Sequence, residues 1–379
     1  MNPIYLDNAA STRVSDEVHA LMTEVTRTAW GNPSSHHPQG AAARGYIEAA
    51  RTRLLAALGD RGTGDVVWTS GCSEANALAV LGAARVRTGR LVMSTLEHPA
   101  IGTLGDRLAA EGRDVVRIAP GPDGVLDADE VAEAAATAAV VSIVMVQNEI
   151  GVVQPIASIV AAIRTRSTSS PSSCHIHIDG AQALGKVPID VAALGIDSLS
   201  IAGHKLHGPK GTGALWLRKA ASIEPLWVGG GQQRGLRGGT QDAPGAAGLG
   251  LAAERAVAAR TTARTRWLEL SARVTSALPA GIVRQLVPDH RRAPHILALA
   301  VSGVPAEALR NVLSSRGVYI STGSACADGD SKPSVALTAI GLPQDAGMVR
   351  LSFALDTKHE EVDEATKILA AAIRDLTKA

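Results

Sequence analysis

The central part of the chain alternates between short apolar runs, rich in β-branched residues, and longer stretches rich in Ala, Leu and Arg. The apolar runs cover residues 66–69, 91–94, 140–146 and 175–179. Strands that alternate with helices predict crossover units and a mostly parallel sheet, covered by helices on both faces. In such sheets, ligands bind beyond the carboxyl ends of the strands.

The pattern changes after about residue 246, where a long Ala/Arg-rich helical stretch continues to about residue 278 as a connector. An apolar strand (296–301), a helix (305–316) and a final strand–helix pair (349–376) follow it. We therefore expect an α/β fold with a large domain over residues 16–250 and a smaller α+β domain over residues 251–379. The N-terminal segment, residues 1–15, should lie near the smaller domain.

Composition narrows the class of protein. Of 379 residues, 46% are hydrophobic but only 2% aromatic, which predicts an aliphatic core. The formal net charge of +1 gives no electrostatic reason to bind nucleic acid or a membrane directly. Three cysteines without a C-x-x-C spacing argue against a disulfide framework and against a metal site. The chain shows no secretory signal and no apolar run of ~18 residues, so we expect a cytoplasmic protein.

A lysine and an aspartate suggest the first candidate chemistry. Lys205 follows a short apolar run in SIAGHKLHGPKGTG (200–213), and Asp179 ends an earlier strand in IDGAQ. This arrangement suits pyridoxal phosphate (PLP), because a lysine amine forms a Schiff base with the cofactor and a carboxylate keeps its pyridine nitrogen protonated. An isolated lysine in such a loop would more often be a surface residue. The neighbouring motifs therefore decide the interpretation.

Two strand-to-helix junctions carry further candidates. In TSGCSEANAL (69–78), Gly71 permits close approach of a ligand, and the first helical N–H groups with the Ser73 hydroxyl suit a phosphate. Ser73 could equally be a simple helix cap. In EHPA (97–100), His98 could stack on a planar ring and transfer protons, or it could cap the helix.

Amides follow the most apolar strand and the aspartate. Asn148, in QNEIGVVQP, and Gln182, in IDGAQ, could both bond a phenolic oxygen. The alternative is that these side chains satisfy turns and backbone groups, since buried polar groups need partners.

Cys326 lies among small and polar residues in STGSACADGDSKPS (321–334), which predicts an accessible loop. An attacking thiol there needs a proton acceptor, because only a few per cent is thiolate at an ordinary pKa. Cys72 and Cys174 fit small residues in or beside the core.

Two more segments suit anions. The glycine-rich run 229–241 contains two arginines and ends near Thr240, and it is either an anion contact or a plain loop. Arg350 lies on an otherwise apolar strand, and a buried arginine needs an anionic partner. The carboxylate of an amino-acid substrate, bound by two parallel hydrogen bonds, would serve.

Together with YLDNAAST (5–12) and GNPSSHHPQG (31–40), these motifs resemble the group I cysteine desulfurases, PLP enzymes of fold-type I and of the class V aminotransferases. The resemblance covers nearly the whole chain. It implies a large PLP-binding domain with a seven-stranded, mostly parallel sheet. It also implies a homodimer that converts L-cysteine to L-alanine and passes sulfur to an acceptor protein.

The resemblance also implies roles for individual residues. Lys205 would hold PLP, Asp179 would pair with its ring nitrogen, and His98 would stack on the ring and transfer protons. Asn148 and Gln182 would contact the ring hydroxyl and its surroundings, and Asn148 would also meet the substrate. Cys326 would attack the substrate sulfur and become a persulfide.

The remaining contacts that the resemblance implies are with the substrate carboxylate and with the phosphate of the cofactor. Arg350 would bind the substrate carboxylate. The phosphate would be held by Gly71, Cys72 (through its backbone), Ser73 and His204, with Thr240 reaching it from the partner subunit. Ala202 stands where many relatives carry a phosphate-binding serine, so Ser200, on the same strand face, is a candidate substitute. Ser73 replaces the usual threonine, and 354–356 departs from the usual Leu-Gly-Arg.

Other functions fit part of this pattern. A selenocysteine lyase, or another class V lyase or transaminase, shares the cofactor motifs, although a transaminase needs no thiol. A Cys-His hydrolase would leave Lys205 and Asp179 unexplained, and a non-catalytic sulfur scaffold would release no alanine. The sulfur acceptor could belong to iron–sulfur cluster assembly, tRNA thiolation or DNA phosphorothioation.

Overall fold

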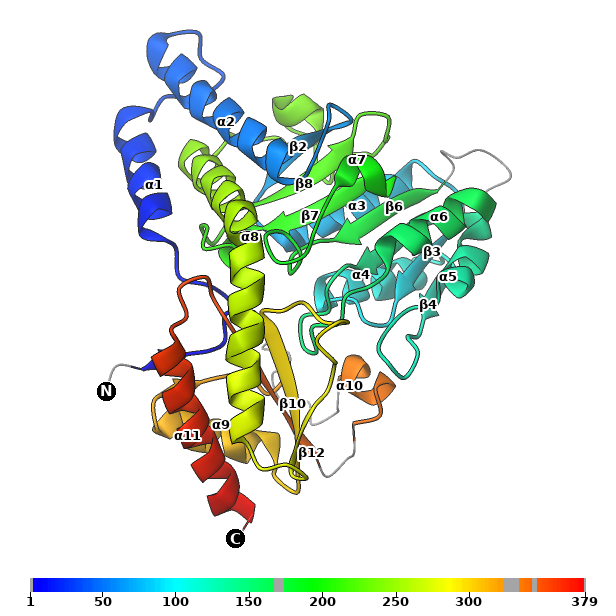
Figure 1. The fold of residues 1–379 in the computed structure, drawn as a ribbon. Coiled ribbons are helices and arrows are strands. Elements are labelled where there is room, and N and C mark those ends of the chain that lie inside the picture. The colour runs from blue at the N-terminus through cyan, green and yellow to red at the C-terminus, as the bar shows by residue number, and fades with distance from the viewer. Residues whose placement is uncertain (1–2, 167–173, 324–333, 343–345, 378–379) are drawn as a thin grey trace.

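A seven-stranded sheet forms the centre of the larger part of the molecule (Figure 1). The structure is a computed structural model that describes residues 3–166, 174–323, 334–342 and 346–377. The strands of the seven-stranded sheet lie in the order β2 (Gly64–Thr69), β8 (Gly213–Arg218), β7 (Ser198–Ala202), β6 (His175–Asp179), β5 (Ala138–Val144), β3 (Arg90–Ser94) and β4 (Val115–Ile118). Strands β3 to β7 are parallel, and β8 is antiparallel to both of its neighbours. The predicted α/β fold is confirmed.

Helices cover both faces of this sheet, which explains why its strands read as continuous apolar runs. Side chains alternate between the faces along each strand. Val67 and Val140 pack in the cluster under α3 (Cys72–Arg85) and α4 (Pro99–Ala110). Val66 and Val141 pack on the opposite side. That side is covered by α2 (Pro38–Ala57), α5 (Ala128–Ala134), α6 (Ile156–Arg166) and α7 (Val191–Leu194).

A smaller antiparallel sheet has the order β12 (Ala346–Ser352), β10 (Ile296–Ser302), β9 (Val283–Gln285). Helices α9 (Ala306–Ser315) and α11 (His359–Thr377) share its hydrophobic cluster. The N-terminal strand β1 (Ile4–Tyr5) pairs in parallel with β11 (Val318–Tyr319), so the start of the chain lies beside this sheet. The short elements η1 (Ala135–Thr137), η3 (Gln232–Gly235) and α10 (Val335–Ala339) complete the described chain together with α1 (Asp16–Thr28), η2 (Gly203–Lys205) and α8 (Ala243–Ala277).

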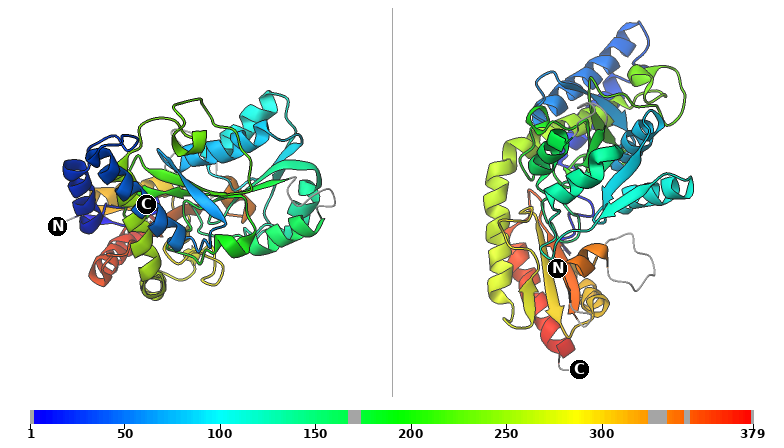
Figure 2. Two further views of the ribbon diagram at one scale, coloured as in Figure 1. Left: turned by 90° about the horizontal axis from the view of Figure 1, so that it is seen from above. Right: turned by 90° about the vertical axis from the view of Figure 1, so that its right-hand side faces the viewer.

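The long helix α8 runs along both sheets (Figure 2). Asp242 caps its N-terminus by accepting a hydrogen bond from the Gly245 N–H, and a proline lies in the first turn. Its buried residues up to Ala256 pack against the large sheet, and those from Ala263 onward pack against the small sheet. We therefore propose that the two domains meet inside this helix, a few residues beyond the boundary expected from the sequence.

The sequence pattern predicted no element for residues 16–57, which form α1 and α2. The buried side of α2 includes Gly40, Ala43 and Ala50, and such small residues give no clear apolar stripe. They allow α2 to lie close to α8, where Gly250 approaches the Ala50 backbone. Within the described ranges, no helix combines the length and the apolar content that crossing a membrane requires.

Candidate active site

A cavity of about 580 Å³ opens at the carboxyl ends of the central strands. This is the edge of the sheet where the sequence predicted that the strand-end side chains meet. Most of the predicted site residues line it: Gly71, Cys72, Ser73, His98, Asn148, Asp179, Gln182, His204, Lys205 and Arg350. Among the residues that the structure describes, no three or more His, Cys, Asp or Glu side chains gather in a way that could hold a metal ion.

Lys205 ends the short turn η2, which directly follows β7. Its Nζ donates hydrogen bonds to the carbonyl of Ala9 and, at 2.8 Å, to that of Ala10. Burial, aided by the positive charge of Arg350, lowers the pKa of Lys205 to about 8. The amine is therefore easier to deprotonate than an ordinary lysine, as a lysine that attacks a carbonyl group needs.

Asp179 ends β6 and lines the cavity, and both of its oxygens accept hydrogen bonds from neutral donors. Its Oδ1 accepts a hydrogen bond from the Ala181 N–H at 2.9 Å, and its Oδ2 accepts one from Asn76 Nδ2 at 2.8 Å. Cys72 Sγ lies 3.7 Å from Oδ1. Burial and the negative charge of Asp179 raise the pKa of the Cys72 thiol well above its usual value, so this thiol stays protonated.

His98 is both a helix cap and a cavity residue, so the two alternatives from the sequence coexist. Its Nδ1 accepts a hydrogen bond from the Ala100 N–H at 3.1 Å at the start of α4. The proton of the neutral ring is therefore on Nε2. Burial lowers the pKa of His98, which favours this neutral form.

The start of α3 provides the groups that suit an anion. Gly71 precedes the helix, no side chain caps this N-terminus, and a Cβ added to Gly71 would meet no atom within 4 Å. Ser73 and His204 line the same cavity, and burial lowers the pKa of His204 to about 4, so its ring is neutral. The exposed Lys210, which the sequence reasoning did not single out, adds a positive charge to this lining.

The two predicted amides, Gln182 and Asn148, are bonded through different groups. Gln182 donates from Nε2 to the Ala9 carbonyl at 2.7 Å, and its Oε1 lies 3.2 Å from His295 Nε2. Both ends of this side chain are therefore already bonded within the protein. Asn148 lines the cavity, and its backbone carbonyl accepts a hydrogen bond from Arg350.

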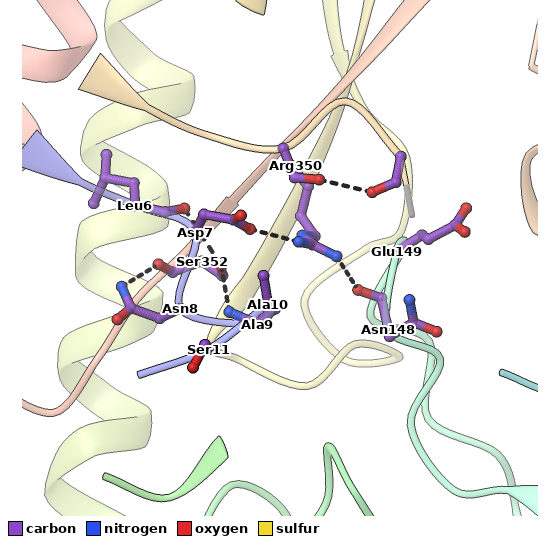
Figure 3. A network of polar contacts seen from close by, with 12 residues as sticks. Leu6, Asp7, Asn8, Ala9, Ala10, Ser11, Asn148, Glu149, Arg350 and Ser352 are labelled. Atoms are coloured by element: carbon purple, nitrogen blue, oxygen red, sulfur yellow. Dashed lines mark hydrogen bonds and ion pairs between the residues drawn. The ribbon is translucent and has the colours of Figure 1, made fainter. Parts of the chain in front are cut away.

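Arg350 lies on β12 and is 2% exposed. Figure 3 shows its guanidinium group between Asp7 and Asn148. One terminal nitrogen lies 2.5 Å from Asp7 Oδ1, and the other donates to the Asn148 carbonyl at 2.7 Å. Its Nε has no partner among the described residues. The sequence predicted an anionic partner for this arginine, and the chain itself provides one in Asp7. The unpartnered Nε is itself buried.

The N-terminal segment 7–12 is the part of the site that the sequence reasoning missed. Besides the Asp7 carboxylate and the Ala9 and Ala10 carbonyls, Thr12 joins it to the lysine turn, because the Thr12 N–H donates to the His204 carbonyl at 2.8 Å. The motif YLDNAAST contributed only to the family resemblance, and its run of small residues after Asp7 indicates a close backbone approach but not its target.

Two predicted residues do not line this cavity, and a third lies outside the described residues. Ser200 is fully buried, its Oγ lies 3.2 Å from Cys72 Sγ, and it is not part of the cavity lining. Thr240 is exposed and does not line the cavity of its own chain. Cys326 lies outside the described residues. The roles assigned to these three residues remain predictions.

Known proteins share this chain's sequence and fold over almost its full length. Residues 4–365 match the family model described as aminotransferase class-V. A cysteine desulfurase of Rhodobacter capsulatus is 38% identical, with 98% of this chain and 97% of the relative aligned. A solved NifS-like protein has a TM-score of 0.90 and 29% identity over 98% of this chain and 100% of its own. The structure titled SspA in complex with cysteine has a TM-score of 0.79 and 32% identity over 92% of this chain and 98% of its own.

Proposed function

This chain belongs to the class V aminotransferase family and is a cysteine desulfurase, and we propose that it converts L-cysteine to L-alanine in the cavity described above. The observation that carries the proposal is the convergence of Lys205, Asp179 and Arg350 on this one cavity. The three supply a nucleophilic amine, a negative charge and a site for a carboxylate. A structural relative determined with cysteine supports the choice of substrate.

The cavity fits PLP as the cofactor that the family implies. Lys205 offers an amine with a pKa of about 8 for the aldehyde, and Asp179 offers a carboxylate for the ring nitrogen. The uncapped start of α3, with open space at Gly71, offers N–H groups to the phosphate, together with Ser73 and His204. When bound there, PLP would supply an electron sink for the bonds at the substrate Cα.

The side chains of the cavity have separate tasks. Arg350 binds the substrate carboxylate through its free N–H groups, and Asn148 orients the substrate beside it. His98 presents its Nε2 proton toward the cavity, while Lys205 takes up and returns a proton at Nζ. Asp179 presents its carboxyl group to the ring nitrogen of the cofactor. Gln182, bonded to Ala9 and His295, forms part of the wall around the ring hydroxyl.

We propose Cys326 as the residue that accepts the sulfur. Its sulfur forms an S–S bond with the substrate sulfur, the Cβ–S bond breaks, and a proton added at Cβ completes alanine. The other two thiols are poor candidates, because burial raises the pKa of Cys174 to about 12 and that of Cys72 well above its usual value. The persulfide sulfur then passes to an acceptor protein.

Replacing Arg350 with alanine should raise KM for cysteine and lower kcat/KM. Loss of a charge-assisted, bidentate contact costs ~2–5 kcal/mol, or roughly thirty-fold or more in kcat/KM. Steady-state alanine formation measures both constants. Arg350→Lys is the matched control, since it keeps a positive charge for Asp7 but loses the planar fork, and it should fall between alanine and wild type. A change below about threefold for the alanine variant, or ~0.7 kcal/mol, would place the carboxylate site elsewhere.

We also propose a homodimer in which Thr240 of one chain reaches the phosphate site of the other. Thr240 is exposed and does not line the cavity of its own chain, and Trp227 and Val228, in the segment before it, are exposed apolar residues. C2 dimers are also the commonest oligomers.

Mixing Lys205→Ala chains with Thr240→Ala chains tests this arrangement. A mixed dimer then contains one site with both an intact lysine and an intact threonine. That site should bind PLP with wild-type affinity, whereas the Thr240→Ala homodimer should bind it more weakly. Absence of rescue in the mixed dimer would place the threonine within its own subunit, and a monomeric, fully active enzyme would refute the proposal.

A further inference from the structure

A continuous chain of buried polar side chains lies behind Asp179. Asn76 Nδ2 lies 2.8 Å from Asp179 Oδ2, and Asn76 Oδ1 lies 3.0 Å from His177 Nε2. Ser198 Oγ lies 2.8 Å from His177 Nδ1 and 2.8 Å from His175 Nε2. All five residues are at most 4% exposed. Such a network in an otherwise aliphatic core is costly unless each member is bonded.

The strand geometry explains how these residues meet. His175, His177 and Asp179 occupy alternate positions of β6, so their side chains lie on one face of the sheet. Ser198 on β7 is the register partner of His177, which places it on the same face. Helix α3 covers this face and contributes Asn76.

Asp179 stands at one end of this row of hydrogen-bonded side chains, and its carboxylate determines the direction of every hydrogen bond in the row. A carboxylate only accepts, so Asn76 donates through Nδ2 and its Oδ1 must accept. His177 therefore carries its proton on Nε2, and its Nδ1 accepts the hydroxyl proton of Ser198. Ser198 Oγ is then left to accept from His175 Nε2. This order leaves His175 Nδ1 bare, and that atom has no partner among the described residues.

The hydrogen-bonded side chains behind Asp179 carry no charge of their own. Burial lowers the pKa of His177 to about 3 and that of His175 to about 4, so both rings stay neutral around neutral pH. Every dipole in the chain nevertheless points a proton toward Asp179. Aligned neutral donors stabilise a negative charge at the end of the chain, and each bond strengthens the next.

We propose that Asn76, His177 and Ser198 form a one-way relay of neutral donors that holds Asp179 as a carboxylate facing the cavity. The inference rests on the proposed PLP site, because a charged Asp179 keeps the proton on the ring nitrogen of the cofactor. His177 and Ser198 are positioning residues, since they act through Asn76 and do not line the cavity. If the relay were lost, the proton between Asp179 and the ring nitrogen of the bound cofactor would move toward Asp179.

Two nuclear magnetic resonance measurements test the relay. The first records the ring ¹⁵N signals of the histidines in the protein. It should show His177 and His175 both neutral and protonated on Nε2, and a proton on Nδ1 of His177 would overturn the proposed direction. Because this measurement does not depend on the cofactor, it separates failure of the relay from failure of the PLP site.

The second measurement follows ¹⁵N-labelled PLP in the holoenzyme at one fixed pH. His177→Leu should shift the ring nitrogen signal toward the unprotonated position, with the unprotonated fraction rising about three- to tenfold. His177→Gln, whose amide can still donate to Asn76, should restore much of the wild-type signal. An unchanged signal in His177→Leu, or equal shifts in both variants, would overturn the relay.

Ser198→Ala provides a variant with little change in volume, should His177→Leu fold poorly. Loss of the hydroxyl removes the donor to His177 Nδ1, so the ring nitrogen signal of the cofactor should move in the same direction by a smaller amount, while Asn76 Oδ1 still holds the His177 proton on Nε2. A folded Ser198→Ala protein with the wild-type cofactor signal would contradict the relay. Wild-type protein that binds no labelled PLP would instead contradict the proposed cofactor.

Discussion

Replacing Lys205 with alanine is expected to reduce cysteine turnover by roughly a thousandfold or more and to leave no cofactor that borohydride can attach to the protein. Burial has lowered the pKa of this amine to about 8, and the Ala9 and Ala10 carbonyls hold it in the cavity. Lys186 cannot replace it, because its Nζ is bonded to the Lys205 carbonyl and it does not line this cavity.

The measurement compares the visible absorbance and the mass of borohydride-treated protein with those of the wild type. Lys210→Ala is the matched control, since Lys210 lines the same cavity but is exposed. That variant should keep reducible cofactor on the protein. A Lys205→Ala protein that still gives the reduced adduct would show that another amine holds PLP.

Replacing Cys326 with serine is expected to abolish persulfide formation and catalytic turnover while substrate binding persists. A serine hydroxyl is a far weaker nucleophile toward sulfur than a thiolate, so the Cβ–S bond of the substrate stays intact. Lys205, Asp179 and Arg350 are unchanged in this variant. Cysteine should therefore still alter the visible absorption spectrum, although no alanine is released.

The other two thiols serve as controls for the Cys326 experiment. Cys72→Ala and Cys174→Ala should keep most activity, because burial raises both pKa values and keeps both groups protonated. Trapping the persulfide with an alkylating reagent and locating it by mass spectrometry identifies the sulfur acceptor directly. Normal turnover by Cys326→Ser, together with an inactive Cys174→Ala, would show that Cys326 is not the residue that accepts the sulfur.

The local pattern of apolar and polar residues was sufficient to predict much of the fold. The strand predicted at 175–179 is β6, and the runs predicted at 91–94 and 296–301 lie within β3 and β10. These segments were readable because strands buried on both faces appear as continuous apolar runs. The pattern failed for α2, where small residues replace most of the apolar stripe that normally marks a buried helix face. Helix α1 does carry such a stripe, at Val18, Leu21, Met22 and Val25, but the sequence reading did not use it.

The sequence by itself placed Gly71, His98, Asn148, Asp179 and Lys205 at the edge of one sheet. It could do so because the carboxyl ends of parallel strands lie on the same side, so residues just after each strand become neighbours in space. The residue types then indicated the chemistry: an amine, a carboxylate, an imidazole and helix N–H groups around one cavity.

Only the tertiary structure decided what each of these groups bonds to. Asp7 pairs with Arg350 from 343 positions away, and the Ala9 carbonyl accepts from Lys205 across 196 positions. The bond from Asn76 to Asp179 likewise joins a helix to a strand 103 positions further on. Periodicity records which face of its own element a side chain occupies, whereas these contacts depend on how separate elements pack. The pairing of Arg350 with Asp7, the low pKa of Lys205 and the direction of the relay behind Asp179 are therefore properties of the packed protein.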